Sequence, residues 1–326
     1  MLIIKAPVTD PYHNIASEEY ILENFEEDVF LLYINEPSII VGKYQNTISQ
    51  LNMDYVQQNK IKVVRRLTGG GAVFHDLGNL NFSFICKHQE KAERGFVRYT
   101  QPIISYLNTL GVNASLEGRN DLLIDGRKFS GNARLVTKEK VLQHGTLLYQ
   151  ARISDLKNAL KVDPLKFNDK AVKSVQSRVT NISEHLTEAM SVTDFEKGLV
   201  TFITNHYPET ERYEFNETDM KAINQKVINK YGSWEWNFGK SPQYNYSRTF
   251  RTKGGTVEID LQVENGVISN CDIYGDFFAM GDIEILVNAL INCPHEPIQV
   301  RKALTDVNVD KILVNIELDD LMQGMF

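Results

Sequence analysis

RRLTGGGAVFHD, residues 65–76, combines two arginines, three consecutive glycines, a histidine and an aspartate. Three glycines in a row lose a large amount of backbone entropy on folding and offer no side chain for packing. Such a run is useful where something approaches the backbone so closely that a Cβ would collide with it. The residues AVFH that follow are typical of a strand, so we expect the glycines to form a loop that enters a strand.

This glycine-rich loop matches neither of the two common nucleotide-binding loops. It lacks the GK[ST] ending of a P-loop, and it lacks the GxGxxG spacing and helix start of a Rossmann fingerprint. Its backbone N–H groups are nevertheless suited to converge on an anion. An anion held by Arg65 or Arg66 beside an apolar wall indicates an amphipathic ligand. A surface turn with flanking charges is the alternative for this stretch alone.

The composition of the whole chain is that of a soluble globular protein. It has 326 residues, of which 42% are hydrophobic and 24% are charged. This length predicts one large or two ordinary domains. The net charge of −7 argues against nonspecific binding to nucleic acid or to an anionic membrane. Three cysteines without CxxC spacing, and no apolar run of signal-peptide or membrane-spanning length, predict a cytoplasmic protein.

Strand and helix patterns alternate along the chain without a fixed repeat. The predicted strands cover residues 2–7, 29–34, 61–66, 79–86 and 141–150, and the predicted helices cover residues 14–25 and 192–207. Residues 79–86 alternate apolar and polar side chains, which predicts a strand buried on one face only. Residues 121–131 predict two strands joined by a tight turn at Asp125-Gly126.

The spacing of these elements predicts an α/β (α+β) fold with a mixed or antiparallel sheet, because the strands follow one another too closely for βαβ crossovers throughout. A change of composition near residues 232–254 predicts a boundary between a large domain, 1–248, and a small α+β domain, 249–326. In the small domain we expect a hairpin turning at Gly266, followed by helices over 283–291 and 311–325. One domain with an appended hairpin is the alternative.

Three further stretches carry side chains suited to chemistry. In EGRNDLLIDGRKFSGNAR, residues 117–134, Lys128 follows the predicted turn, and Asn120-Asp121 on the preceding strand is placed to hold a ribose or a metal-bound phosphate. His144 interrupts an apolar strand, where a core histidine is the plainer interpretation. Residues 157–178 carry six cations and two carboxylates, so six minus two gives +4. This excess predicts either an anion-binding loop or the solvated face of a helix.

Together, these stretches resemble the lipoate–protein ligase A family. The motifs RRLTGGGAVFHDLGN, GRNDLLIDGRKFSGNA, HGTLL, KSVQSRVTN and SWEWNFG occur in that family's order and at similar spacing. The resemblance covers nearly the whole chain. It implies a large domain related to the biotin ligase catalytic core and a small C-terminal domain that moves during the reaction.

The activity that the resemblance implies has two steps. Lipoate and Mg·ATP give lipoyl-adenylate and pyrophosphate, and the lipoyl group then passes to a lysine. The acceptors would be lipoyl domains of 2-oxoacid dehydrogenase E2 subunits or the glycine-cleavage carrier protein, with no role for nucleic acid or membranes. Any Mg²⁺ would arrive with the nucleotide, since the sequence has no HExxH or paired CxxC motif.

The resemblance also implies roles for individual residues. Lys128 would be the catalytic lysine and would contact both ATP and lipoate, and Asp121 is a weak candidate for the metal. The residues implied to bind ATP or the adenylate are Arg66, Gly71, Ala72, Val73, Phe74, Asn120, Asp121, Ser174 and Arg178. The residues implied to bind lipoate are Arg66, Gly69, Gly70, Gly71, His75 and His144.

Three other functions are weighed against this one. An octanoyltransferase of the same superfamily would use a cysteine nucleophile or a lysine–cysteine pair and would not need ATP, and no cysteine lies inside the motifs. A biotin ligase would carry a GRGRxG-type loop, which RRLTGGG is not. A carrier-binding protein without catalysis would have lost the lysine or the glycine loop, and both are intact.

Overall fold

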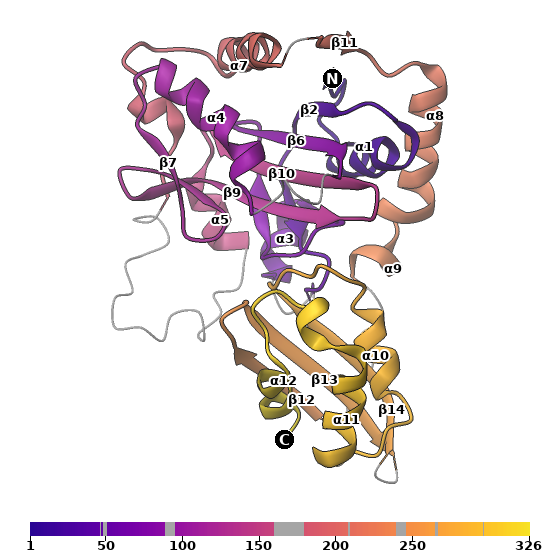
Figure 1. The fold of residues 1–326 in the computed structure, drawn as a ribbon. Coiled ribbons are helices and arrows are strands. Elements are labelled where there is room, and N and C mark those ends of the chain that lie inside the picture. Colours follow the sequence, from indigo (N-terminus) through magenta and orange to yellow (C-terminus); the bar gives the residue numbers. More distant parts are fainter. Residues whose placement is uncertain are drawn as a thin grey trace.

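The fold was analysed in a computed structural model of the chain. The structure describes residues 1–45, 47, 51–88, 95–159, 179–207, 209–238, 246–264, 267–295 and 297–326. Figure 1 shows a large N-terminal part built around a long sheet, with a smaller C-terminal part at one end of it. The expected fold class, a mixed sheet with an additional small α+β unit, is confirmed.

The main sheet has eight strands in the order β11-β1-β2-β6-β10-β9-β8-β7. Their bounds are β1 Leu2–Lys5, β2 Val29–Ile34, β6 Asn79–Lys87, β7 Ala114–Glu117, β8 Asp121–Ile124, β9 Arg127–Val136, β10 Lys140–Leu148 and β11 Glu211–Tyr213. Strand β1 pairs in parallel with β2 and β11, and every other neighbouring pair is antiparallel. The sheet is therefore mixed, as the sequence predicts.

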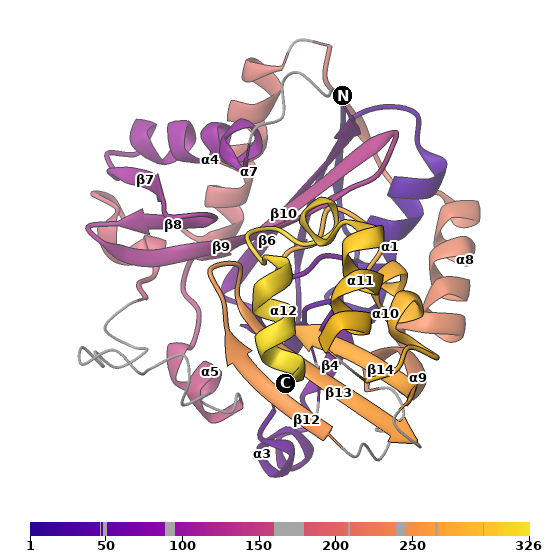
Figure 2. The ribbon, with the colours of Figure 1, turned by 60° about the horizontal axis from the view of Figure 1, so that its bottom comes forward.

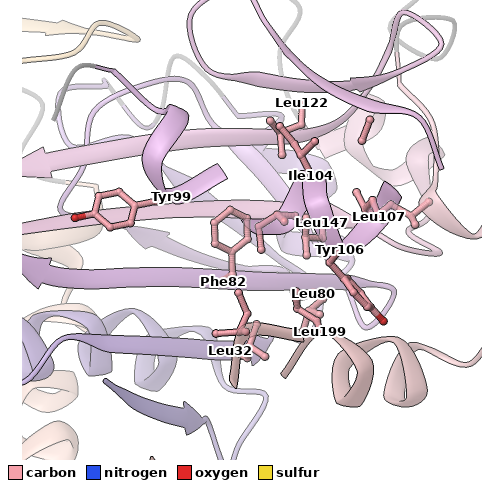
Figure 3. Packing of buried hydrophobic residues seen from close by; sticks show 14 of the residues in the cluster. Leu32, Leu80, Phe82, Tyr99, Ile104, Tyr106, Leu107, Leu122, Leu147 and Leu199 are labelled. Atoms are coloured by element: carbon pink, nitrogen blue, oxygen red, sulfur yellow. The ribbon is translucent and has the colours of Figure 1, made fainter. Parts of the chain in front are cut away.

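Helices cover both faces of this sheet. The helical segments of the large part are α1 Pro11–Asn24, α3 Met53–Gln58, α4 Val97–Thr109, α5 Ile153–Ala159, η2 Ile182–His185, α7 Val192–His206, α8 Glu217–Lys226, η3 Val227–Tyr231 and α9 Trp234–Asn237. Side chains of α4 and α7 pack with Phe82 and Phe84 on one face, part of which is drawn in Figure 3. On the opposite face, α1 and α8 pack with Leu31 and Ile85.

Strand β6 shows why one sequence prediction was wrong. Its alternation of apolar and polar residues predicted one buried face, but eight consecutive residues from Asn79 to Cys86 are buried. Strand β6 lies between β2 and β10 in the middle of the sheet, so both of its faces are covered by helices. The polar residues of β6 face the α1 side, where Ser83 donates a hydrogen bond to the buried carboxylate of Glu18.

The start of α1 differs from the prediction because local capping extends the helix toward the N-terminus. The predicted helix began at residue 14, whereas α1 begins at Pro11. The Asp10 side chain accepts hydrogen bonds from the backbone N–H groups of Tyr12 and His13. A proline at the first helical position needs no N–H partner, so DP is a start signal.

A second, three-stranded sheet carries the glycine-rich loop. Its order is β4-β3-β5, with bounds β3 Ser38–Val41, β4 Lys62–Arg65 and β5 Val73–His75. Strand β3 pairs in parallel with β4 and antiparallel with β5. The loop over residues 66–72 therefore connects β4 to β5 across the intervening β3 and enters a strand, as predicted.

The described part of the C-terminal unit packs three α-helices and a short 3₁₀ helix against one three-stranded sheet; Figure 2 shows this unit with the bottom of the Figure 1 view turned forward. Its segments are β12 Tyr246–Arg251, β13 Thr256–Glu264, β14 Val267–Gly275, α10 Glu284–Leu290, α11 Pro297–Val307, η4 Val309–Lys311 and α12 Leu318–Met325. The predicted Gly266 turn lies outside the described residues. Strand β12 begins before residue 249, and residues 239–245 are not described, so the position of the domain boundary stays a prediction.

The last predicted helix is shorter than expected. The sequence pattern predicted a helix over 311–325, but α12 begins only at Leu318. Before it, Asn315 has a left-handed φ of 56°, and Ile312 and Leu313 are buried in the C-terminal core. A capping box at Glu317 then starts the helix. Within the described residues, no helix has the length and apolar character needed to cross a membrane.

Candidate active site

A cavity of about 160 Å³ lies between α1, the glycine-rich loop and strands β9 and β10. Most of the described residues that the sequence singled out share its wall. These are Arg66, Gly70, Gly71, Ala72, Val73, His75, Asn120, Lys128 and His144. The structure thus brings together three motifs that are separated by up to 78 residues, taking 144 minus 66 along the chain.

Other predicted site residues lie elsewhere. Gly69 and Phe74 are absent from the cavity wall, and Phe74 is buried in a separate core beside β3. Asp121 is not part of the wall either, but its carboxylate is paired with Lys128. Ser174 and Arg178 lie outside the described residues. Val179 and Thr180, which follow them, run alongside Lys128, whose carbonyl accepts a 2.9 Å hydrogen bond from the Thr180 N–H.

Lys128 reaches the cavity because of a local irregularity in the β8–β9 hairpin. Asp125 and Gly126 both have positive φ values, 50° and 72°, which suits a tight two-residue hairpin turn. Just beyond it, the register shifts by one residue, so that Leu123 opposes Lys128 while Asp121 opposes Gly131. A Cβ on Gly131 would lie 3.0 Å from the Lys128 Nζ atom, so this glycine leaves room for the lysine side chain.

Lys128 is a suitable cation for joining two anions. Its Nζ atom lies 2.7 Å from Asp121 Oδ1, and both side chains are partly exposed, at 37% and 39%. An arriving anion can therefore reach the ammonium from the cavity side. A compact ammonium with three donors is able to contact a carboxylate and a phosphate together.

The two neighbouring arginines have different functions. Arg65 donates six hydrogen bonds to the segment 42–47 and to residues 236–237, so its five N–H groups are all used in holding the fold together. Arg66 lines the cavity instead. Its Nη2 atom donates to the carbonyls of Gly69 and Gly71, at 2.6 and 2.9 Å. Of the pair RR, only Arg66 is therefore available to a ligand, and it also shapes the glycine loop.

His75 presents an unpaired donor at the cavity wall. Burial, together with the nearby Arg66 charge, lowers the pKa of His75 to about 3, so the imidazole is neutral. Its Nδ1 atom accepts a 3.0 Å hydrogen bond from the Asn35 amide, which places the proton on Nε2. The Nε2 atom has no partner within the described protein. A buried donor of this kind is suited to bind an oxygen of a ligand.

Several contacts of the site were not predicted from the sequence. Glu18 on α1 is fully buried and accepts hydrogen bonds from the side chains of Tyr33, Ser83 and His144. The signal was present, because Glu18 lies three residues after Ile15 and three before Ile21 on the apolar side of a predicted amphipathic helix. A carboxylate at such a position has to have buried partners.

The glycine loop also contacts the C-terminal unit. A Cβ on Gly69 would overlap with the backbone carbonyl oxygen of Phe277. That same oxygen accepts a 3.1 Å hydrogen bond from the N–H of Gly70, whose φ is 92°. The missing side chain of Gly69 therefore lets the C-terminal unit approach, and a contact of Gly69 with a ligand stays a prediction. Gly71 has only ordinary contacts.

A second contact links the C-terminal unit to the turn between β7 and β8, next to Asn120. The Arg119 guanidinium lies 4.2 Å from the centre of the Phe278 ring and donates a 2.7 Å hydrogen bond to the Gly254 carbonyl. Phe278 also packs edge-on against Phe96, with ring centres 5.7 Å apart. The C-terminal unit therefore borders the site on two sides, at the glycine loop and beside Asn120.

Among the described residues, no group of three or more His, Cys, Asp or Glu side chains is arranged to hold a metal ion. Asp121 is a single carboxylate beside the site and is engaged with Lys128.

Two family models and a curated relative match this chain. Residues 10–204 match the family described as lipoyl protein ligase A/B catalytic domain, and residues 241–325 match the bacterial lipoate protein ligase C-terminus. The chain is 42% identical over 323 residues to lipoate-protein ligase LplJ of Bacillus subtilis, covering 98% of each chain.

Two solved structures share the fold. LipL1 of P. falciparum, in complex with lipoate, has a TM-score of 0.80 and 24% identity, covering 99% of this chain and 98% of that one. A lipoate-protein ligase A bound with ATP has a TM-score of 0.62 and 23% identity, covering 73% and 97%. With two family matches and a relative similar over nearly its full length, this chain belongs to the lipoate–protein ligase family of enzymes.

Proposed function

We propose that this ligase activates lipoate with ATP to give lipoyl-AMP and pyrophosphate, and then transfers the lipoyl group to a lysine of an acceptor protein. The observation that carries the proposal is the composition of the cavity wall. Apolar side chains of Ile15, Ile40 and Val73 share it with the Lys128 ammonium and the Arg66 guanidinium. An apolar wall suits an acyl chain, and the cations suit a carboxylate and a phosphate.

Electrostatics explains why the activation step needs Lys128. Bringing a carboxylate to the α-phosphate places two anions in contact, and one such repulsion is about 4 kcal/mol at 4 Å and an effective dielectric of about 20. The Lys128 ammonium offsets this repulsion and stabilises the charge that develops at phosphorus. The unpaired His75 donor and the Arg66 guanidinium are the further groups able to bind lipoate or phosphate oxygens.

In the activation step, a carboxylate oxygen of lipoate forms a bond to the α-phosphorus, and the bond from that phosphorus to the bridging oxygen breaks, so pyrophosphate leaves. In the transfer step, the amine of the acceptor lysine attacks the carbonyl carbon of the mixed anhydride. An amide forms, AMP leaves, and the amine loses a proton. Mg²⁺ enters as part of the ATP substrate, and Asp121, which is paired with Lys128, is the candidate carboxylate beside it.

The cysteines favour an ATP-dependent reaction over an octanoyltransferase. Cys86 is buried in the core of the large part and Cys271 in that of the C-terminal unit, while Cys293 is half-buried. None of the three lines the cavity. A transferase would need a thiol nucleophile at that place. The solved relatives with lipoate and with ATP support the two substrates by fold.

For the acceptors we propose lipoyl domains of 2-oxoacid dehydrogenase E2 subunits and the glycine-cleavage carrier protein. These acceptors follow from the family resemblance of the sequence motifs. A cytoplasmic location stays a prediction from the cysteine pattern.

The decisive test is lipoate-dependent ATP–pyrophosphate exchange with purified protein, Mg²⁺ and no acceptor. We expect exchange that requires lipoate. If no exchange occurs but synthetic lipoyl-AMP still supports acyl transfer, the chain is a transferase and the activation step is refuted. If neither reaction occurs, both steps of the proposal are wrong.

A further inference from the structure

A chain of buried hydrogen bonds leads from α1 to the cavity. The Glu18 carboxylate lies 2.9 Å from Nδ1 of His144, and Nε2 of His144 lies 2.7 Å from the Thr68 hydroxyl. That hydroxyl in turn accepts a 2.9 Å hydrogen bond from Nε of Arg66. All four side chains are buried, with exposed fractions of 0%, 7%, 1% and 5% in that order.

The donors of this chain can be assigned from its two charged ends. Arg66 can only donate, so the Thr68 oxygen accepts from it. The Glu18 carboxylate accepts, so Nδ1 of His144 carries a proton. The Thr68 hydroxyl keeps its own hydrogen, which can be donated to Nε2 of His144. Glu18 therefore determines the tautomer of His144, and His144 determines the direction of the Thr68 hydroxyl.

Arg66 is the point at which the chain meets the site. Its Nε atom is held by Thr68, Nη1 donates to the Ile40 carbonyl, and Nη2 donates to the carbonyls of Gly69 and Gly71. Turning the guanidinium would break these bonds together and release the glycine loop. We propose that Glu18 is a positioning residue for the ligase reaction, acting on Arg66 through His144 and Thr68. This inference rests on the proposed function, because it places Arg66 at the lipoate–ATP site.

Charge supports the same conclusion. Arg66 is buried at the cavity wall, and burial lowers its pKa to about 10, while the nearby Glu18 charge opposes that shift. A buried guanidinium without a counter-charge would be strongly unfavourable. The His144 and Thr68 side chains connect Glu18 to Arg66, so the opposite charges of these two residues can compensate each other. They also keep the guanidinium apart from the Glu18 carboxylate, which would otherwise compete with an anionic substrate.

A purely structural role is the competing explanation. Glu18 also accepts hydrogen bonds from Tyr33 on β2 and Ser83 on β6, so it joins α1 to the sheet. Ser83 provides the matched control, because it contacts the same carboxylate but is not part of the path to Arg66 and does not line the cavity. Ser83→Ala should reduce stability without a selective effect on catalysis.

The experiment compares Glu18→Gln, Thr68→Val and Thr68→Ser with Ser83→Ala. We expect Glu18→Gln and Thr68→Val each to lower kcat/KM for lipoate in the exchange reaction by about tenfold to a hundredfold, since each removes a hydrogen bond in a path to a charged group. Thr68→Ser keeps the hydroxyl and should stay within about threefold of the wild type. The double variant Glu18→Gln/Thr68→Val should be no worse than the poorer single variant.

Nitrogen NMR of the imidazoles gives a readout that a merely structural role would not change. In the wild type we expect the His144 proton on Nδ1. The amide that Glu18→Gln introduces can donate to Nδ1, so in this variant the proton should move to Nε2. Wild-type kcat/KM in Glu18→Gln, or effects of the two single variants that multiply in the double variant, would overturn the proposal.

Two further outcomes are separable. If Glu18→Gln does not fold, the two Thr68 variants and the His144 tautomer of the wild type test the proposal instead. A wild-type His144 with its proton on Nε2 would refute the link from Glu18 to Arg66. Equal activity of Thr68→Val and Thr68→Ser would refute it as well. If the wild type shows no lipoate-dependent exchange, the proposed function fails. The positioning role is then judged by lipoate affinity in calorimetry, which Thr68→Val but not Thr68→Ser should weaken.

Discussion

The ammonium of Lys128 lies 2.7 Å from the carboxylate of Asp121, across the β8–β9 hairpin. Both side chains are more than a third exposed, at 37% and 39%. An ion pair with this exposure contributes little to folding stability. Its effect is to hold the amine at the cavity wall while leaving it free to exchange Asp121 for an arriving anion.

Lys128→Ala should therefore abolish lipoate-dependent ATP–pyrophosphate exchange and leave the thermal midpoint nearly unchanged. The lysine removes the repulsion between carboxylate and phosphate, and alanine cannot. Lys138→Ala, at an exposed position of the next hairpin, is the control and should alter neither quantity. Exchange near the wild-type rate in Lys128→Ala would show that another group supplies the charge.

Gly69→Ala should weaken the contact between the glycine loop and the C-terminal unit. Its Cβ would overlap with a backbone carbonyl, that of Phe277, which cannot rotate away as a side chain could. Gly71→Ala is the matched control, because its Cβ would be 3.8 Å from the nearest atom and should not disturb the contact with the C-terminal unit. We expect proteolysis between the two units to become faster in Gly69→Ala and to stay unchanged in Gly71→Ala. Equal proteolysis of both variants and the wild type would contradict this explanation of Gly69.

Arg65→Met should lower the free energy of unfolding by about 3 to 5 kcal/mol, because it leaves buried acceptors unsatisfied. The substitution removes a donor from six acceptors at residues 42, 43, 45, 47, 236 and 237, of which the carbonyls of Gly42 and Asn237 keep a second donor. Urea denaturation measures the change. If Arg65→Met instead kept its stability and lost affinity for ATP, Arg65 would be an anion-binding residue, the option that the sequence left open.

His75 should make stability depend on pH. Its pKa of about 3 in the folded state lies below the ordinary value of 6.5, because burial and the Arg66 charge disfavour the imidazolium. The unfolded chain binds the proton more tightly, so protonation favours unfolding. The contribution of neutral His75 to the free energy of unfolding is fully present above pH 6.5 and is lost progressively as the pH falls toward 3. Between pH 6.5 and pH 5 the free energy of unfolding should fall by about 2 kcal/mol.

The test of this pH dependence is urea denaturation at both pH values for the wild type and for His75→Gln. The variant should show a smaller loss of stability on acidification, because glutamine does not titrate. A wild-type loss no larger than that of His75→Gln would contradict the low pKa of His75. Nitrogen NMR at pH 5 should also show His75 neutral, with its proton on Nε2.

The sequence predicted the parts of the fold that depend on interactions between residues close together in the chain. The turn at Asp125-Gly126 was predictable because few residues adopt positive φ, and Asp-Gly is a typical pair for a two-residue hairpin turn that requires it. The strand over 29–34 was also predicted with the correct bounds, because its residues VFLLYI are apolar, aromatic or β-branched. Strand β6 and the last helix were predicted incorrectly, because burial on a second face and the left-handed Asn315 depend on what packs around them.

The sequence by itself determined the family, the mixed-sheet fold and the three motifs that meet at the cavity. Only the tertiary structure decided which residue of each motif stabilises the fold and which faces the cavity. Only packing shows that Arg65 holds the fold while Arg66 faces the cavity, and that Gly69 accommodates Phe277. Packing also places the Glu18 carboxylate within hydrogen-bond distance of Nδ1 of His144. The physical reason is that a side chain's role depends on its partners, and partners distant in sequence leave no local pattern.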